Sequence, residues 1–282
     1  MCLLGIQVHS GYCLQELTNS LIHNTEIVLR KKGSYRHKHI AASGDLASQG
    51  DTIINVVISA EKKALFEEGK VILIDKPLHW TSFDVVRKIR GAIRIKKVGH
   101  AGTLDPLATG LLIVCTGKFT KKINEYMAQV KEYTGSFTLG AITPTYDLES
   151  QPEKFKDISE LTEKNILDTT KKFIGEIDQV PPIYSAIKKK GTPLYELARR
   201  GEDIELQPRK ISIHSFEITA IKLPVVEFKI VCSTGTYIRS VAHDFGVALD
   251  CGAYLSSLRR AAIGDFRVGT AETIDSFLQS LN

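Results

Sequence analysis

The chain has 282 residues, of which 43% are hydrophobic and 24% are charged, and its formal net charge is +5. This composition supports a folded domain with its own core and excludes a chain that is disordered throughout. The five cysteines include no Cys-x-x-Cys pair, so neither a disulfide framework nor a zinc site is indicated, and we expect a reducing, cytoplasmic protein. No stretch approaches the roughly 20 apolar residues of a membrane-spanning helix, and we expect no membrane partner. The mild positive charge suits a polyanionic partner without identifying one.

Residues 1–65 differ in composition from the rest of the chain. They show no sustained hydrophobic period, and they carry a basic cluster at residues 31–39 that is followed by a Ser/Gly/Asp-rich stretch. Two interpretations are open: an accessory RNA-binding arm, or a poorly ordered extension. The missing periodicity favours the extension. We therefore expect a poorly ordered extension over residues 1–65 and a folded domain over residues 66–282.

The first part of the expected domain predicts a strand, a helix and a second strand. Residues 71–74 form an apolar run typical of a buried strand, and Pro77 ends it because proline cannot donate to a sheet ladder. Thr81 or Ser82 can cap the helix that follows, whose apolar positions recur at helical spacing: Val85, Val86, Ile89 and Ile93. Residues 111–116 predict a buried strand, and residues 118–129 predict a basic helix.

The second part predicts several strands that follow one another directly. Residues 131–140 alternate between apolar and polar side chains, as a half-exposed strand does. Further strands are predicted at 211–218 and 225–231, paired as antiparallel neighbours. Helices are predicted at 161–173 and 194–200, and the run 233–240 opens another that continues through 245. Because strands and helices do not alternate as βαβ units, the predicted fold class is α+β, a mixed and largely antiparallel sheet with flanking helices.

Residues 99–110 read Gly-His-Ala-Gly-Thr-Leu-Asp-Pro-Leu-Ala-Thr-Gly, which we interpret as a loop that holds the carboxylate of Asp105. The three glycines allow backbone conformations that are closed to other residues, and Pro106 biases Asp105 toward an extended conformation. A lone cluster of Gly, Asp and Pro is more often a tight turn in which the aspartate bonds its own backbone. The particular order of residues argues for more than a turn.

The pattern Gly-His-x-Gly-x-Leu-Asp-Pro-x-Ala-x-Gly resembles the catalytic motif of the bacterial tRNA pseudouridine synthases of the B (TruB) family, which isomerise uridine 55 in the T loop. Three further runs, at residues 179–188, 233–240 and 252–260, also resemble the family, and the resemblance covers about residues 66–266. It implies the pseudouridine synthase fold, with an RNA-binding cleft across the sheet and the T-arm stem-loop of tRNA as partner. We expect a monomer that needs no cofactor. Many members carry a C-terminal RNA-binding domain of the PUA type, which we expect to be absent here.

The resemblance also implies roles for individual residues. Asp105 would be the essential nucleophile, and Arg239 would pair with it, because a guanidinium can hold a carboxylate in a two-pronged geometry. Tyr133 would be a catalytic-site platform on which the flipped uracil stacks, and His100 would occupy the space near the flipped nucleotide. The remaining pocket residues would be Tyr237 and Leu258 as lining, and Lys76 and Tyr184 at the rim.

Other readings of these residues stay open at this point. Arg239 can instead form a surface ion pair that contributes little to stability. Asp147 lies in a turn-rich loop and needs no special function there. No metal constellation appears, since His37 and His39 lie next to lysines without acidic or cysteine neighbours. A tRNA-binding folding factor without isomerase activity is the main rival, and a hydrolase of N-glycosidic bonds is a second. The presence of both Asp105 and Arg239 favours the isomerase.

Overall fold

The first described helix lies earlier in the chain than the sequence predicts. The computed structural model describes residues 58–185, 187–189, 191–201 and 206–281, all of which lie in the unit Ile53–Asn282. Helix α1 spans Ala60–Glu68, and the Ser59 side chain caps it by accepting a hydrogen bond from Lys62 N at 3.2 Å. The expected boundary between residues 65 and 66 therefore falls inside a helix. Sequence patterning missed α1 because none of its residues is fully buried. The expected poor order of residues 1–57 lies outside the described residues.

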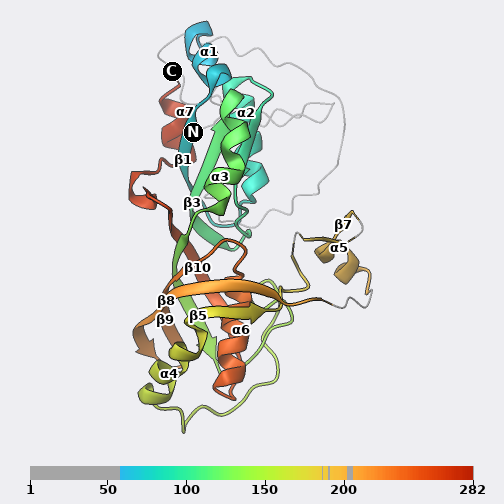
Figure 1. Cartoon of the computed structure of the whole chain (residues 1–282), viewed down its shortest axis with the longest axis vertical. Helices are drawn as coiled ribbons and strands as arrows, with labels where there is room; N and C mark the ends of the chain where they lie inside the picture. The colour runs from blue at the N-terminus through green and yellow to red at the C-terminus, as the bar shows by residue number, and fades with distance from the viewer. Residues whose placement is uncertain (1–57, 186, 190, 202–205, 282) are drawn as a thin grey trace, which may run out of the picture. The chain divides into compact units, whose positions relative to one another are not determined.

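The order of helices and strands along the chain can be followed by colour in Figure 1. The helices are α1 (Ala60–Glu68), α2 (Ser82–Ile93), α3 (Ile123–Ala128), α4 (Glu163–Thr170), α5 (Leu194–Arg199), α6 (Ile238–Ala248) and α7 (Ile274–Gln279), with the 3-10 turns η1 (Gly117–Lys122), η2 (Lys171–Phe173) and η3 (Val268–Thr270). The strands are β1 (Val71–Lys76), β2 (Val98–Ala101), β3 (Ala108–Thr116), β4 (Lys131–Leu139), β5 (Gly175–Gln179), β6 (Lys188–Lys189), β7 (Thr192–Pro193), β8 (Arg209–Lys222), β9 (Val225–Cys232), β10 (Ala253–Ile263) and β11 (Phe266–Arg267).

One mixed sheet organises the described residues. Its strand order is β1-β3-β10-β4-β9-β8-β5, with β2 added to β3 and β11 added to β10, while β6 and β7 form a separate two-stranded sheet. Within the described chain, β10 and β3 pair in parallel and the other strand pairs are antiparallel. The α+β class with a largely antiparallel sheet is confirmed, as is the antiparallel pairing of β8 with β9.

The parallel pair of β3 and β10 joins the two parts of the sheet. Leu258 of β10 lies opposite Ala108, and Arg260 lies opposite Gly110. A side chain at Gly110 would not fit, because an added Cβ would lie 2.4 Å from the backbone oxygen of Arg260. This close approach places the β2–β3 connection beside β10 and, through β10, beside β4.

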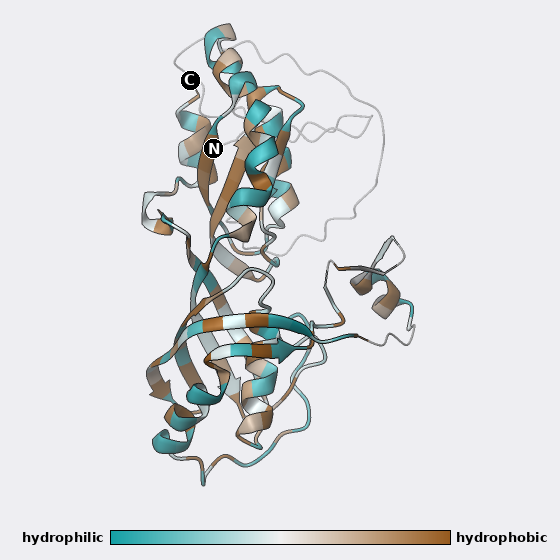
Figure 2. Ribbon diagram, viewed as in Figure 1, coloured by the Kyte–Doolittle hydropathy of each residue, from teal (hydrophilic) through white to brown (hydrophobic). Residues whose placement is uncertain are grey.

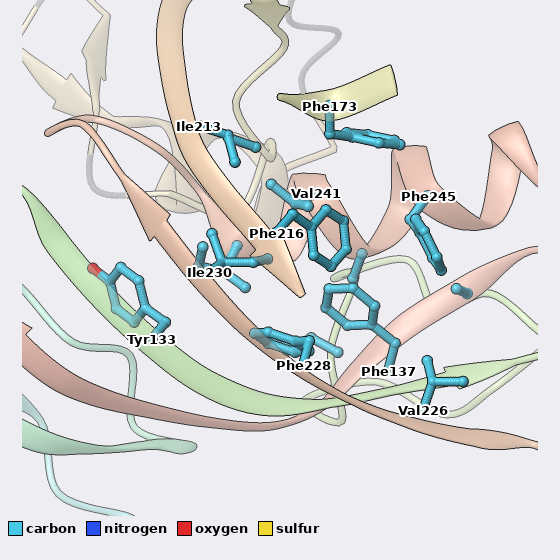
Figure 3. Packing of buried hydrophobic residues seen from close by; sticks show 14 of the residues in the cluster. Tyr133, Phe137, Phe173, Ile213, Phe216, Val226, Phe228, Ile230, Val241 and Phe245 are labelled. Atoms are coloured by element: carbon cyan, nitrogen blue, oxygen red, sulfur yellow. The ribbon is translucent and has the colours of Figure 1, made fainter. Parts of the chain in front are cut away.

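Among the described residues, the two largest hydrophobic clusters pack helices against the sheet. The larger one lies against β4, β8, β9 and α6, where Phe137 stacks on Phe228 with ring centroids 4.2 Å apart and Phe216 and Phe245 complete the aromatic centre (Figure 3). The smaller one packs one face of β1 and β3, whose ribbons are largely brown in Figure 2, against the apolar face of α2; its residues from these strands are Ile72, Ile74, Leu112 and Val114. The helical spacing of the apolar residues of α2 predicted this burial correctly.

Two sequence predictions need correction. The predicted helix over residues 118–129 begins as the 3-10 turn η1, in which the Thr120 hydroxyl donates to the backbone oxygen of Gly117 at 2.8 Å and competes with α-helical bonding. The predicted loop over residues 99–110 is shorter, because its first residues belong to β2 and its last residues to β3. The connection itself is residues 102–107, which we call the Asp105 loop.

Candidate active site

The Asp105 loop is anchored on both sides of its carboxylate. The buried hydroxyl of Ser82, at the start of α2, accepts a hydrogen bond from Leu104 N at 2.8 Å and donates to Leu104 O at 3.2 Å. On the other side, the backbone N–H of His79 donates to Pro106 O at 2.8 Å. These bonds hold the loop rigidly, while the Asp105 side chain remains 43% exposed. The expectation that Asp105 is held is confirmed.

Arg239 meets Asp105 from α6, and its side chain is 5% exposed. Its Nε lies 3.0 Å from Oδ2 of Asp105. Its two terminal nitrogens are engaged elsewhere, since Nη1 donates to Thr145 O at 3.2 Å and Nη2 donates to Tyr184 O at 2.9 Å. The ion pair was predicted correctly, but the expected two-pronged geometry was wrong, because two backbone carbonyls occupy the fork of the guanidinium.

Asp147 is a second carboxylate beside Arg239. It is buried, and its Oδ2 lies 3.7 Å from Nε of Arg239. Its Oδ1 accepts a hydrogen bond from Glu149 N at 3.0 Å, so it also caps its own turn. The capping role is the one a turn aspartate suggests in a sequence, and only the fold reveals that the same carboxylate lies next to Arg239.

A pocket of about 330 Å³ opens beside Asp105. Most of its wall is apolar, and the exposed side chains of Leu78 and Leu148 contribute to it. The lining residues are Leu78, His79, Asp105, Leu107, Ala108, Asp147, Leu148, Leu255, Ser256, Ser257 and Leu258. Of the site residues implied by the family resemblance, Asp105 and Leu258 line this pocket.

Tyr133 lies on β4, at the edge of the larger hydrophobic cluster. Figure 3 shows its hydroxyl turned away from the phenylalanine rings. The residue is 8% exposed, and burial raises the pKa of its phenol, whereas the charge of Arg260 acts in the opposite direction. The negative charge of Asp105 has a smaller effect, which raises the pKa of Tyr133 further.

His100 lies on β2 and is not among the residues that line the pocket. Its Nδ1 is buried and has no hydrogen-bond partner among the described residues. Burial lowers the pKa of its imidazole, and the nearby charge of Arg260 lowers it further. The structure therefore places His100 next to Arg260 and not at the pocket wall.

Tyr237 and Tyr184 both lie close to Arg239. Tyr237 directly precedes α6, and the side-chain amide of Gln179 binds its backbone by donating to its oxygen at 3.1 Å and accepting from its N–H at 2.9 Å. Burial raises the pKa of the Tyr237 phenol. Tyr184 contributes its backbone oxygen to Arg239. Both residues thus belong to the surroundings of the ion pair.

Lys76 does not lie at a rim, and that prediction was wrong. The residue is fully buried at the end of β1, where its Nζ donates to Pro77 O at 2.8 Å and to Trp80 O at 2.6 Å. Burial lowers the pKa of its ammonium to about 8, and the attraction of Asp105 acts against this shift. Two backbone carbonyls explain how a lysine is accommodated in the interior beneath the Asp105 loop.

The arrangement offers a held and accessible carboxylate, a buried guanidinium and an apolar pocket. Such a carboxylate can act as a nucleophile or as a base on a molecule bound in the pocket. In the described part of the chain, no group of three or more His, Cys, Asp or Glu side chains is arranged to hold a metal ion. None of the described helices has the length and apolar character needed to cross a membrane.

Comparison with known proteins shows which family shares these features. The family described as "TruB family pseudouridylate synthase (N terminal domain)" matches residues 90–238. The "tRNA pseudouridine synthase B" of Flavobacterium johnsoniae is 56% identical over 221 residues, which cover 76% of this chain and 96% of the relative. The protein of the same name from Phocaeicola vulgatus is 46% identical, with 77% of this chain and 95% of the relative covered.

Solved structures share the fold. A structure described as a Cbf5-Nop10-Gar1 complex contains a chain that is 31% identical to this one, with a TM-score of 0.60 over 76% of this chain. An H/ACA RNP bound to a substrate RNA containing 2′-deoxyuridine contains a chain that is 28% identical, with a TM-score of 0.58 over 78% of this chain. The chain spans about half the length of these two solved chains, 54% of each.

Proposed function

The chain belongs to the TruB family of pseudouridylate synthases, and we propose that it converts uridine 55 in the T loop of tRNA to pseudouridine with Asp105 as the nucleophile. The observation that carries the proposal is the 3.0 Å ion pair between the buried Arg239 and the accessible Asp105. The name shared by the two curated relatives, tRNA pseudouridine synthase B, supports tRNA as the substrate.

Pseudouridine formation breaks the bond between N1 of uracil and C1′ of ribose, rotates the base and rejoins it through C5. A carboxylate assists by attacking C1′, by removing the C2′ proton to give a glycal, or by attacking C6 of the base. All three routes use an ionised Asp105. The buried guanidinium of Arg239 stabilises that negative charge by Coulomb attraction, which is stronger away from water.

The target uridine is stacked inside the T loop, so it must flip out to meet Asp105, which costs unstacking energy. We propose Tyr133 as the platform under the flipped base, a role that rests on the family resemblance. Leu258, which lines the pocket beside Asp105, would contact that base, whereas Tyr237 would act from its place beside Arg239. His100 would occupy the space near the flipped nucleotide, a role that rests on the family motif.

The proposed partner is the T-arm stem-loop of tRNA, bound by a monomer in the cytoplasm. The described cysteines Cys115, Cys232 and Cys251 are free thiols, as suits a reducing compartment. Lys76 and Tyr184 would support the site from behind, Lys76 beneath the Asp105 loop and Tyr184 through its backbone bond to Arg239.

A direct assay separates the proposal from its rivals. The purified protein is incubated with a transcript of a T-arm stem-loop, and the RNA is analysed for pseudouridine, free uracil and binding. We expect one pseudouridine per molecule, at position 55. Binding without any modification would favour the folding factor, and release of uracil with an abasic site would favour the N-glycosidic hydrolase.

A further inference from the structure

Arg260 is a fully buried arginine of β10, 1% exposed, to which the proposed reaction assigns no role. Its Nε donates to Leu111 O on β3 at 2.8 Å, and its Nη2 donates to Gly102 O at 3.0 Å. Gly102 is the first residue of the Asp105 loop and has a φ of +91°, a conformation that favours glycine. Arg260 thus pins the start of the loop that carries the proposed nucleophile.

The same guanidinium reaches Tyr133. The two residues are directly opposite each other across the antiparallel pair of β10 and β4, and the charge of Arg260 acts to lower the pKa of the Tyr133 phenol. A guanidinium carries donors and no acceptor, so it can only donate to the phenol oxygen. Arg260 therefore lies beside both the Asp105 loop and Tyr133.

The charges around Arg260 are unfavourable for a buried arginine whose only role is to stabilise the fold. Among the described residues, no carboxylate forms an ion pair with it. Two further buried cations, Lys76 and Lys131, lie near enough for the charge of Arg260 to lower their pKa values, which burial brings to about 8. Buried charges without counterions are costly, and an apolar residue would serve a core better. The free-energy cost of burying Arg260 without a counterion indicates that this residue has a functional role.

We propose that Arg260 is a positioning residue of the isomerisation, which fixes the Tyr133 hydroxyl and the Asp105 loop to a single guanidinium. Tyr133 lies on β4 and Asp105 lies in the loop between β2 and β3, and Arg260 is bonded to that loop through Gly102 O and lies opposite Tyr133. The spacing between the ring under the base and the carboxylate is thereby held constant. The inference rests on the proposed roles of Asp105 and Tyr133.

The kinetic test compares Arg260→Lys with Arg259→Lys. Arg259 is the neighbouring residue of β10 and forms a half-exposed ion pair with Asp75, so it controls for the chemical change on the same strand. Each variant is assayed in single turnover on the T-arm stem-loop, with the Kd measured separately. For Arg260→Lys we expect the single-turnover rate to fall by at least about 30-fold while the Kd changes by less than about 3-fold. For Arg259→Lys we expect both the rate and the Kd to change by less than about 3-fold.

A double-variant cycle tests whether Arg260 acts through Tyr133. If it does, Arg260→Lys costs at least about 5-fold less in a Tyr133→Phe background than in the parent. Fully additive losses would overturn the proposal. Tyr133→Phe removes only a hydroxyl and keeps the packing of the ring. It therefore tests the proposal even if Arg260→Lys fails to fold. A single-turnover rate for Tyr133→Phe equal to that of the parent would overturn the proposal.

A titration gives a readout that a purely structural role would leave unchanged. Tyrosine labelled with ¹³C at the ζ carbon is followed by NMR against pH, and the Tyr133 signal is assigned by its loss in Tyr133→Phe. Because a guanidinium donor favours the phenolate, we expect a higher pKa for Tyr133 in Arg260→Lys than in the parent. An unchanged pKa would contradict the proposal. This titration does not depend on catalysis, and the absence of pseudouridine with the parent protein would instead count against the proposed function.

Discussion

Nε of Arg239 lies 3.0 Å from Oδ2 of Asp105, yet the two side chains differ greatly in exposure, at 5% and 43%. The guanidinium is fixed in the interior by the backbone oxygens of Thr145 and Tyr184. The carboxylate is fixed by its anchored loop and remains open to the pocket. This asymmetry gives a charge that is held in place and still accessible to a substrate, as a nucleophile requires.

Arg239→Lys should lower the single-turnover rate by about 100-fold, which corresponds to about 2.7 kcal/mol. A lysine keeps the positive charge, but a single ammonium on a flexible stem cannot face Asp105 while also donating in fixed directions to Thr145 O and Tyr184 O. Thermal melts establish that the variant is folded. A rate within about 3-fold of the parent would show that the two hydrogen bonds of Arg239 and the placement of its ion pair with Asp105 are unimportant for the reaction.

Ser82→Ala should loosen the Asp105 loop, because it removes both hydrogen bonds that the buried hydroxyl makes with Leu104. We expect a loss of about 1–3 kcal/mol in the free energy of unfolding, since buried backbone groups lose their partner, and a rate at least about 10-fold lower. Urea unfolding and single-turnover assays measure the two effects.

The matched control for Ser82→Ala is Thr81→Ala, one residue earlier. Thr81 caps α2 through its hydroxyl, which accepts a hydrogen bond from Asp84 N at 3.0 Å. In the described part of the chain, the Thr81 side chain forms no hydrogen bond with the Asp105 loop. Its loss should cost about 1 kcal/mol of stability and leave the rate within about 2-fold. Equal rate losses in the two variants would mean that the effect passes through α2 and not through the loop.

Asp244→Asn should stabilise the protein at high pH and not at low pH. Burial raises the pKa of Asp244, on α6, to about 6 from the ordinary 3.8. The folded state therefore holds this proton more tightly than the unfolded state, so the stability that the group contributes at low pH is lost as the pH rises from about 4 to 6. The asparagine does not ionise and keeps that stability.

Because Asp244 is partly exposed, we expect the gain at pH 8 to be about 1–2 kcal/mol, less than the full value of the shift. Urea unfolding of parent and variant at pH 8 and at pH 3.5 measures it. The free energies of unfolding of the parent and the variant should differ only at pH 8. A constant difference at both values would attribute the effect to packing and not to ionisation.

Removing residues 1–57 should leave the rate and the salt dependence of tRNA binding unchanged, because no motif of the family lies there. The rival interpretation, a basic arm, predicts a change: four phosphate contacts would each add about 0.9 to the salt slope of duplex binding. Removing residues 1–65 is a different experiment, since it cuts α1, where Phe66 packs edge-on against Phe277 at 6.2 Å. That longer deletion should lower the melting temperature.

Periodicity predicted the parts of the fold that are regular in sequence. The apolar face of α2 and the alternation of β4 were both found where they were expected. Strand β10 was missed, although it lies in the middle of the sheet, because bulges between Leu255 and Ser257 and between Arg260 and Ala262 interrupt its pairing with β4 and blur its alternation.

The sequence predicted the ion pair between Asp105 and Arg239, but it did not predict the backbone groups that hold this pair in place. The motif containing Asp105 and the run containing Arg239 led to an ion pair that the structure contains. The partners of that pair come from distant connections, such as Thr145 and Tyr184, and no local pattern identifies a backbone carbonyl as a ligand of an arginine. The resemblance placed Lys76 at the rim of the pocket, whereas in the fold two backbone carbonyls satisfy its ammonium in the interior, where lysines are rare.

The central claim, that Asp105 is the nucleophile, is tested most directly by Asp105→Asn in single turnover on the T-arm stem-loop. The amide keeps the shape of the side chain and removes its charge, so we predict a Kd for tRNA within about 3-fold of the parent and no pseudouridine above that of a mock purification. Pseudouridine formed by Asp105→Asn above that control would contradict the assignment.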